Sequence, residues 1–147
     1  ILEAWVPFIK ASCIVVVDDH VASDFFRETV IKMAIPRDVE VIISNIEDFS
    51  RNFIYKNNGR GKKAIVLFSE IADALKAFQA GFKFKKLNIG NVYNEKCVKQ
   101  CSPSVLLGDG EIQAVKILLD AGIDIDIRRV PSEKPIDLRR LIKGIGS

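Results

Sequence analysis

Long apolar runs are missing from this 147-residue sequence. None reaches the roughly 20 residues that a helix needs to cross a bilayer. The opening segment also lacks a basic leader and a small-residue cleavage site, which are the marks of a secretory signal. We therefore expect neither a membrane-spanning helix nor a secreted protein.

Histidine and cysteine are also scarce, with one histidine and the three cysteines Cys13, Cys97 and Cys101. A tetrahedral zinc site normally needs four such ligands, so we predict no metal site. The odd number of cysteines is typical of a reduced, cytoplasmic setting. The net charge of +3 is too small to indicate nucleic-acid binding, and too few aromatic residues accompany the lysines to form a stacking surface for bases.

The most informative feature present is an apolar run that ends in two carboxylates. Residues 14–17, Ile-Val-Val-Val, are followed directly by Asp18 and Asp19, and a helical pattern begins within a few residues. Unbroken β-branched runs are typical of strands that are buried on both faces. Open parallel sheets bind ligands just beyond the carboxyl ends of their strands. We therefore expect this acidic pair to lie at a functional edge.

Strand-like and helix-like segments alternate along the whole chain. The predicted strands cover residues 13–19, 39–44, 64–68, 86–90, 104–107 and 124–130. The predicted helices cover residues 1–10, 22–35, 46–54, 70–79, 110–121 and 135–143, with a basic loop at residues 55–63 and Pro36 at a helix end. Such alternation implies right-handed crossovers. It predicts a single-domain, three-layer α/β fold over residues 1–147, whose mostly parallel sheet has helices on both faces.

Amphipathic patterns also predict the packing of several elements. The regular alternation at residues 124–130 predicts an edge or antiparallel strand near the C-terminus. Trp5 is expected in the core beside Phe8, and Asp109 is expected to cap the helix that follows it. The helix after the acidic pair is expected to direct five apolar side chains into a core, namely Phe25, Phe26, Val30, Ile31 and Met33.

The first residues give a further expectation. The chain opens with Ile1 rather than Met, and the pattern there is already helical. No residue that would cap a helix precedes it. We therefore expect the sequence to be a fragment, with a structured segment upstream of Ile1.

Three motifs together resemble a known family. They read DDHVASDFFRETVIKMAIP from Asp18, KKLNIGN from Lys85 and IDIRRVPSEKPIDL from Ile125. In this order and at these separations they resemble the IIB component of the mannose/fructose/sorbose family of the phosphoenolpyruvate-dependent sugar phosphotransferase system. The resemblance covers essentially the whole chain, and the motifs are more specific together than singly.

The resemblance implies a phosphotransferase that needs no cofactor. In that family the IIB domain takes a phosphoryl group from a phosphorylated IIA protein onto a histidine. It passes the group to a sugar that enters through the membrane IIC and IID permease subunits. The resemblance therefore implies a cytoplasmic protein associated peripherally with the permease, and it does not identify the sugar.

The family's phosphoacceptor histidine lies in a loop that reads Arg-x-Asp-x-Arg-Leu-x-His-Gly-Gln. An apolar residue follows that loop, with a tryptophan four positions later, and Ile1 and Trp5 match this tail. The resemblance therefore places the acceptor three residues before Ile1. It implies that these 147 residues lack the domain's first strand and its phosphoacceptor loop, and hold no catalytic residue of their own.

Six residues are candidates for orienting that loop or lining a phosphate pocket. Asp18 and Asp19 would repel a phosphate, so we expect at least one of them to pair with arginines of the loop; the alternative is a turn or capping role. Asp24 fits the first turn of a helix, where an acid favours the helix dipole. Ser69 follows a strand, where it would either donate to a phosphate or cap the next helix. Gly90 and Asn91 follow another strand, with Gly90 expected to supply backbone freedom.

His20 and the overall activity leave alternatives open. The family places another residue at the position of His20, so the resemblance gives this histidine no acceptor role, and a surface or capping role is the alternative. A receiver-like signalling domain would share the acidic pair, Ser69 and the Lys134–Pro135 dipeptide, but no third aspartate ends the middle strand. A non-catalytic homologue that binds a IIA partner is the third interpretation.

Overall fold

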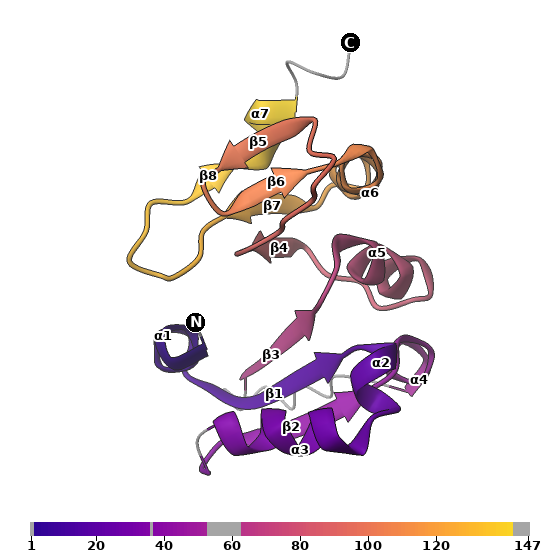
Figure 1. The fold of residues 1–147 in the computed structure, drawn as a ribbon, viewed down its shortest axis with the longest axis vertical. Helices are drawn as coiled ribbons and strands as arrows, with labels where there is room; N and C mark the ends of the chain where they lie inside the picture. Colours follow the sequence, from indigo (N-terminus) through magenta and orange to yellow (C-terminus); the bar gives the residue numbers. More distant parts are fainter. Residues whose placement is uncertain (1, 36, 53–62, 143–147) are drawn as a thin grey trace. The chain divides into compact units, whose positions relative to one another are not determined.

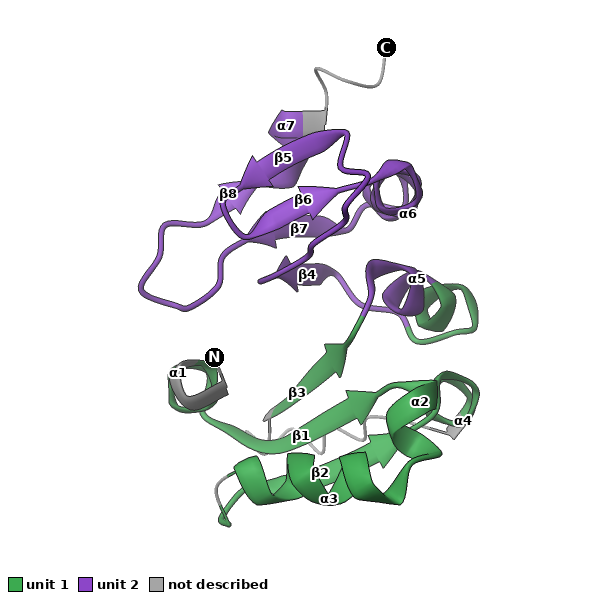
Figure 2. Ribbon diagram, viewed as in Figure 1, with its two compact units in different colours: residues 1–69, 76–82 green, residues 70–75, 83–147 purple. Residues whose placement is uncertain are grey.

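The computed structural model describes residues 2–35, 37–52 and 63–142, which form two compact units (Figures 1 and 2). Unit 1 comprises residues 1–69 and 76–82, and unit 2 comprises residues 70–75 and 83–147. Both units combine helices with a parallel pair of strands, so the predicted α/β class is confirmed. Most of the predicted basic loop, and the helix end expected at Pro36, lie outside the described residues.

Unit 1 is built on a parallel sheet whose strands end level with one another. Strands β1 (Ala11–Val17), β2 (Glu40–Ser44) and β3 (Lys63–Phe68) are arranged in the order β2-β1-β3. In this register Val17 lies opposite Ser44 on one side and Phe68 on the other. The carboxyl ends of all three strands therefore meet at one edge.

Helices cover both faces of this sheet, as predicted. Alternate residues of β1 contribute to two separate apolar clusters, since side chains of a strand point to opposite faces in turn. Val15 and Val17 pack with residues of α4 (Ile46–Asn52) and of the part of α5 (Ile71–Gln79) that belongs to unit 1. Ile14 and Val16 pack on the other face with residues of α1 (Leu2–Ile9) and α3 (Phe25–Ala34). The predicted strand buried on both faces is thus confirmed.

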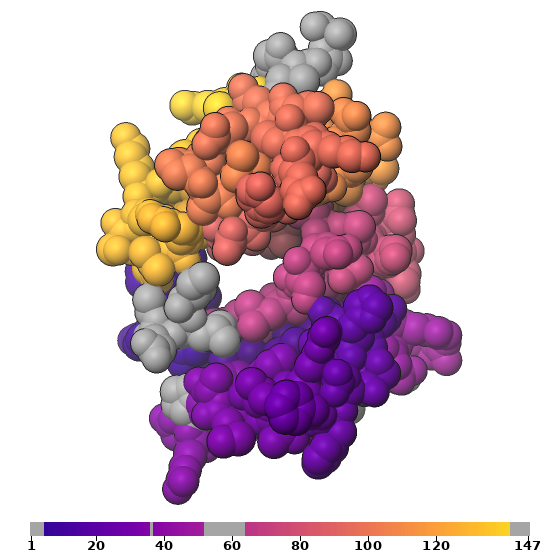
Figure 3. Space-filling view, in the orientation of Figure 1, coloured from indigo at the N-terminus to yellow at the C-terminus, as the bar shows by residue number. Residues whose placement is uncertain are grey.

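The prediction that α3 directs five apolar side chains into a core is wrong. Phe25, Phe26 and Met33 are 82%, 76% and 80% exposed, and Val30 is exposed as well. Only Ile31 packs against the cluster formed by Ile14 and Val16. The segment lies on the viewer's side of its unit (Figures 1 and 3). A separate short helix, α2 (Asp19–Ala22), ends at Ser23, and α3 begins at Phe25.

The first helix buries less than its periodicity predicted. Trp5 is half-buried, and its ring meets that of Phe8 edge to face at 6.0 Å between centroids. Phe8 itself is exposed, while Val6 makes the contact with the sheet. A one-residue rotation of the helix relative to the expected face explains this difference, because neighbouring residues lie about 100° apart.

Unit 2 contains a second sheet and a hairpin. Strands β4 (Lys86–Ile89) and β7 (Asp124–Ile127) pair in parallel, and β8 (Ile136–Asp137) pairs antiparallel with β7. Strands β5 (Lys99–Ser102) and β6 (Val105–Leu107) form an antiparallel pair. Helices α6 (Asp109–Asp120) and α7 (Leu138–Ile142) complete the unit. The sequence pattern does not predict β5, because its residues are mostly polar, and at β8 it predicts a helix in place of the strand.

The segment at residues 124–130 is not an edge strand, contrary to the prediction. In the order β4-β7-β8 it lies in the middle, and the antiparallel strand near the C-terminus is β8. Its alternation arises because Ile125 and Ile127 are buried on one face. On the other face Asp126 accepts a hydrogen bond from Asn88 of β4 at 3.2 Å. The alternation of apolar and polar residues therefore indicates a strand with one buried face, and it does not indicate an edge strand.

Helix α6 begins one residue earlier than predicted, with Gly108 as its cap in place of Asp109. The backbone N–H of Gly108 donates to the Glu111 carboxylate at 3.2 Å, and Asn94 donates to the same carboxylate at 2.6 Å. A Cβ atom at position 108 would lie 2.4 Å from Nδ2 of Asn94. The cap is glycine because a neighbouring side chain occupies that space. None of the described helices is both long enough and apolar enough to cross a bilayer.

Two phenylalanine substitutions test this distribution of core and surface. Phe49 of α4 is 2% exposed and packs its ring against Phe82 at 4.6 Å and Phe68 at 6.2 Å. We expect Phe49→Ala to lower the free energy of unfolding by about 3–5 kcal/mol, because it leaves a cavity. Phe25→Ala is the control, with an expected change below about 0.5 kcal/mol. Denaturant titration measures both, and a comparable loss in the two variants would contradict the exposed position of α3.

Candidate functional site

The candidate site lies at the carboxyl edge of the sheet in unit 1. Asp18 follows β1, Asn45 follows β2 and Ser69 follows β3. The backbone N–H of Asp18 extends the β1–β2 ladder by donating to the Ser44 carbonyl at 3.0 Å. Three polar residues that are far apart in the sequence therefore converge here, as parallel strand ends require.

Asp18 is buried, with 7% of its surface exposed, and its carboxylate is bound by three donors. The backbone N–H groups of His20 and Val21 donate to Oδ1 at 2.8 Å and 3.1 Å, which caps helix α2. The Ser69 hydroxyl donates to Oδ2. This carboxylate therefore ties the end of β1 to α2 and to the end of β3.

These hydrogen bonds keep Asp18 in its charged form. Burial by itself raises the pKa of an isolated carboxyl group, and it does so at Asp18. The hydrogen bonds from Ser69, Val21 and His20, with the nearby His20 side chain, outweigh burial and lower the pKa of Asp18 below its ordinary value of 3.8. The donors thus compensate the desolvated charge, as a buried carboxylate requires.

Asp19 is exposed and makes a different contact. Its Oδ1 accepts a hydrogen bond from the backbone N–H of Ile46, the first residue of α4, at 2.9 Å. Asn45 caps the same helix by accepting from the Asp48 N–H at 2.7 Å. Within the part of the chain that the structure describes, no hydrogen bond to Oδ2 of Asp19 is found. One oxygen of Asp19 faces α4 and the other remains available.

Asp24 and His20 occupy local positions beside this edge. Asp24 caps α3, because its carboxylate accepts from the N–H groups of Phe26 and Arg27 at 3.0 Å and 3.3 Å. His20 lies exposed on the four-residue helix α2. For Asp24 a helix-terminal role, which the sequence analysis predicted, accounts for its contacts.

Gly90 and Asn91 belong to unit 2, after β4, and are not part of this cluster in unit 1. Asn91 is exposed. The expectation that Gly90 supplies special backbone freedom is wrong, since only Gly81 and Gly122 have a positive φ among the described glycines. A Cβ atom at Gly90 would meet only ordinary contacts, the nearest at 3.8 Å from the Arg128 carbonyl oxygen. Its carbonyl accepts a hydrogen bond from the Ser104 hydroxyl at 3.2 Å.

Unit 2 also contains a cavity of 340 Å³ that the sequence analysis did not predict. It lies between the turn that joins β5 to β6 and the segment that follows β7. The motif RRVPSEKP, which begins at Arg128, contributes to the lining of the cavity. In the sequence this motif indicates the resemblance to a family, and it does not by itself predict a cavity. Among the described residues, no group of three or more His, Cys, Asp or Glu side chains is placed to hold a metal ion.

Comparisons with known proteins agree with one another. A family model described as "PTS system sorbose subfamily IIB component" matches residues 1–146. The fructose-specific EIIB component of Bacillus subtilis is 27% identical over 145 residues, which cover 99% of this chain and 88% of that protein. The mannose-specific EIIAB component of Escherichia coli is 26% identical over 96% of this chain, which spans only 43% of that protein.

The fold is also found among solved structures. The IIB domain of the sorbose permease from Klebsiella pneumoniae superposes with a TM-score of 0.85 at 24% identity, covering 98% of this chain and 88% of that one. At this identity the likeness establishes the fold alone. It supports the mixed α/β architecture described above.

Acid titration tests the network at Asp18. Because its folded pKa lies below 3.8, its contribution to stability is complete above that pH and is lost as the pH falls through the folded value. We expect Asp18→Asn to lower the free energy of unfolding by about 1 kcal/mol at neutral pH. We also expect a shallower loss of stability than in the wild type from about pH 5 to about pH 2. Equal slopes in the two proteins would contradict the assignment.

Ser69→Ala tests the same network from the partner side. Removing the hydroxyl takes away a donor to a charged acceptor, and we expect a loss of about 1–2 kcal/mol at neutral pH. The matched control is Ser12→Ala, which removes an exposed hydroxyl from β1 and should change stability by less than about 0.5 kcal/mol. Urea unfolding of both variants gives the comparison.

Proposed function

Because this chain belongs to the sorbose subfamily of IIB components of the phosphotransferase system, we propose that the carboxyl edge of unit 1 orients the family's phosphoacceptor loop. IIB components of this system take a phosphoryl group from a IIA protein and transfer it to a sugar, and the chain is a phosphotransferase of that kind. The family match over residues 1–146 carries this conclusion. No observation favours a receiver-like domain.

The phosphoryl group is accepted by the loop histidine, three residues ahead of Ile1 in a chain that carries the loop, and not by His20. An acceptor imidazole must present one neutral nitrogen while a hydrogen bond holds the other. His20 lies on a four-residue helix beside the carboxylate of Asp18, which would repel the incoming phosphoryl oxygens. The motif that Ile1 and Trp5 match supplies the alternative acceptor.

Asp19 is the better candidate of the two acids for holding the loop. Both oxygens of Asp18 are engaged by donors of the chain itself, and the residue is buried. Asp19 is exposed, and among the described residues its one hydrogen-bond donor is the N–H of Ile46, which binds Oδ1. Oδ2 can accept a charge-assisted hydrogen bond from an arginine of the loop. Asp18 then has an indirect role: its carboxylate caps α2, and Asp19 is the first residue of that helix.

The partners follow from the family. The donor is a phosphorylated IIA protein, the acceptor is a sugar, and the chain works on the cytoplasmic side beside IIC and IID permease subunits. The exposed lysines Lys83, Lys85 and Lys86 are suited to steer an acidic IIA surface, since such charges mainly raise the rate of encounter. The identity of the sugar is expected to depend on the membrane subunits.

Phosphoryl labelling tests the acceptor. The loop Arg-x-Asp-x-Arg-Leu-x-His-Gly-Gln, taken from a family member, is fused ahead of Ile1 and the chain is mixed with labelled phosphoenolpyruvate and the donor proteins. We expect an acid-labile phosphohistidine that is lost when the loop histidine is changed to alanine and kept in His20→Gln. The 147-residue chain alone should stay unlabelled. A label that depends on His20 would overturn the assignment.

The rate of labelling tests Asp19. Asp19→Asn keeps an oxygen that can accept from the Ile46 N–H, so the fold should survive, but the charge that would hold an arginine is removed. We expect the rate constant at saturating phospho-IIA to fall about tenfold, which corresponds to about 1.4 kcal/mol of lost orientation.

The matched control is Asp120→Asn, an exposed carboxylate at the end of α6. It should label at the wild-type rate. Thermal unfolding of both variants separates orientation from stability, because a purely structural role of Asp19 would lower the midpoint of unfolding. An unchanged rate in Asp19→Asn would rule out its role in holding the loop.

A further inference from the structure

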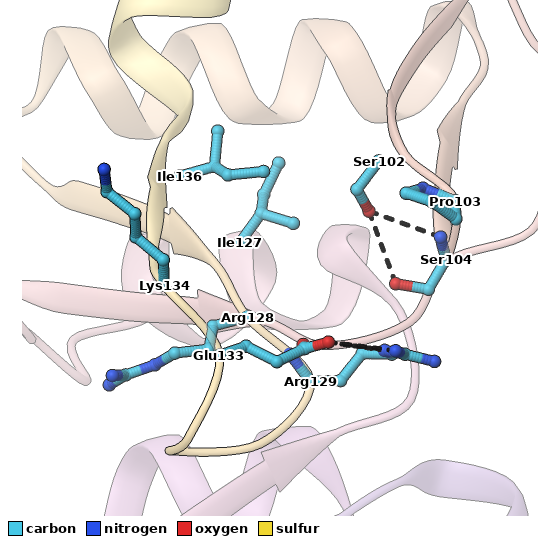
Figure 4. A pocket seen from close by; sticks show the side chains of 9 residues that line it. All are labelled: Ser102, Pro103, Ser104, Ile127, Arg128, Arg129, Glu133, Lys134 and Ile136. Atoms are coloured by element: carbon cyan, nitrogen blue, oxygen red, sulfur yellow. Dashed lines mark hydrogen bonds and ion pairs between the residues drawn. The ribbon is translucent and has the colours of Figure 1, made fainter.

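The cavity of unit 2 has a volume of 340 Å³, which is within the range of small-molecule sites. All of its lining belongs to residues 102–136 of unit 2. Figure 4 shows two serines on one side, a lysine on the other and two isoleucines between them. The cavity therefore offers hydroxyl groups on one side and an ammonium group on the other, with an apolar surface between them.

Positive charge predominates in the lining. Arg128, Arg129 and Lys134 contribute three cations, against one carboxylate from Glu133. That carboxylate is already neutralised, because it accepts from Arg129 Nη2 at 2.9 Å, Nε at 3.3 Å and the Arg129 backbone N–H at 2.8 Å. The hydrogen bonds from the Arg129 side chain and backbone N–H, with the Arg129 charge, lower the pKa of Glu133, so it stays ionised and paired.

Arg128 and Lys134 supply the other two cations of the lining. The Arg128 side chain is 20% exposed, donates to the Pro131 carbonyl at 3.3 Å and lies 3.9 Å from the Asp126 carboxylate. These contacts hold the guanidinium in place at the wall, as a preorganised anion site requires. Lys134 is exposed and forms no ion pair with a carboxylate of the described residues. Its ammonium can move to meet an anion.

The opposite wall offers hydroxyl groups beside an apolar surface. The Ser102 and Ser104 hydroxyls lie 3.3 Å apart, and Ser104 also donates to the Gly90 carbonyl at 3.2 Å. Because Ser104 donates to Gly90, the Ser102 hydroxyl donates to Ser104 or to a ligand. Ile127 and Ile136 supply the apolar floor between the serines and Lys134 (Figure 4).

We propose that this cavity binds a phosphate monoester of a small polyhydroxylated molecule, of the kind that a sugar phosphate represents. The dianion meets Arg128 and Lys134, the C–H face of the carbon skeleton packs on the isoleucines, and the hydroxyl groups meet Ser102 and Ser104. The choice of a sugar ester rests on the proposed function, whose product has this chemistry. The binding that we propose needs no phosphohistidine.

Calorimetric titration of the unphosphorylated 147-residue chain at low ionic strength tests the proposal. The probes are glucose 6-phosphate, inorganic phosphate and glucose. We expect saturable binding of glucose 6-phosphate with a Kd of about 1 mM or tighter. Inorganic phosphate should bind at least about fivefold more weakly, since it lacks contacts with the apolar floor and the serines. Glucose should not bind measurably.

Two lining variants and a control make the test specific. Lys134→Gln should weaken binding about tenfold, because a charged donor is lost. Ser102→Ala should weaken it about threefold. Lys96→Gln removes an exposed lysine of unit 2 that is not in the lining and should leave the Kd unchanged. Circular dichroism establishes that each variant is folded.

Three outcomes would overturn the proposal. They are the absence of saturable binding, equal affinity for inorganic phosphate and the ester, and binding that neither lining variant weakens. No donor protein enters this titration, so its failure leaves the labelling of the loop histidine untouched. Conversely, if the loop-fused chain bound the ester but its loop histidine never became labelled, the proposed function alone would be refuted.

Discussion

The carboxylate of Asp18 is almost wholly removed from water, and it remains ionised there because three donors are directed at its two oxygens. A buried carboxylate without such donors would have a raised pKa. One donor comes from β3, 51 residues further along the chain, and two come from α2. Satisfying this single charge therefore fixes where β3 ends and where α2 begins relative to β1.

Asp18 and Asp19 are adjacent in the chain, but their carboxylates have different roles. Asp18 is buried at the sheet edge, whereas Asp19 begins α2 and is exposed. Asp19 contacts the N-terminus of α4, where an acid also favours the helix dipole. The buried acid is a structural requirement, and only the exposed one has an oxygen left for a further partner. The sequence pattern Asp-Asp cannot distinguish these roles, because it records neither burial nor direction.

Much of the fold could be predicted, because its strongest elements depend on local patterns. The run Ile-Val-Val-Val predicted a strand covered on both faces, and the two clusters around β1 confirm it. The exposed face of α3 could not be predicted, since the spacing of apolar residues does not record which side of a helix meets the sheet, and only Ile31 of the five packs there. Likewise β5 is polar and is stabilised by pairing with β6, a long-range property that periodicity does not record. At the site, the approach of Ser69 to Asp18 was implied by parallel strand ends, but its hydrogen bond was not.

The acids at the edge of unit 1 place a constraint on the chemistry. A phosphoryl group brought near Asp18 and Asp19 adds negative charge to an acidic region, and like charges at close range raise each other's pKa. Neutralisation must therefore come from a cation that binds carboxylate and phosphoryl oxygens together. A guanidinium can do so, because its five N–H donors lie in a fixed plane and can bind two acceptors at once. An ammonium supplies charge without that directional constraint. The orientation that we propose for Asp19 thus calls for arginine in the loop, which is the residue type in the motif that the sequence resembles.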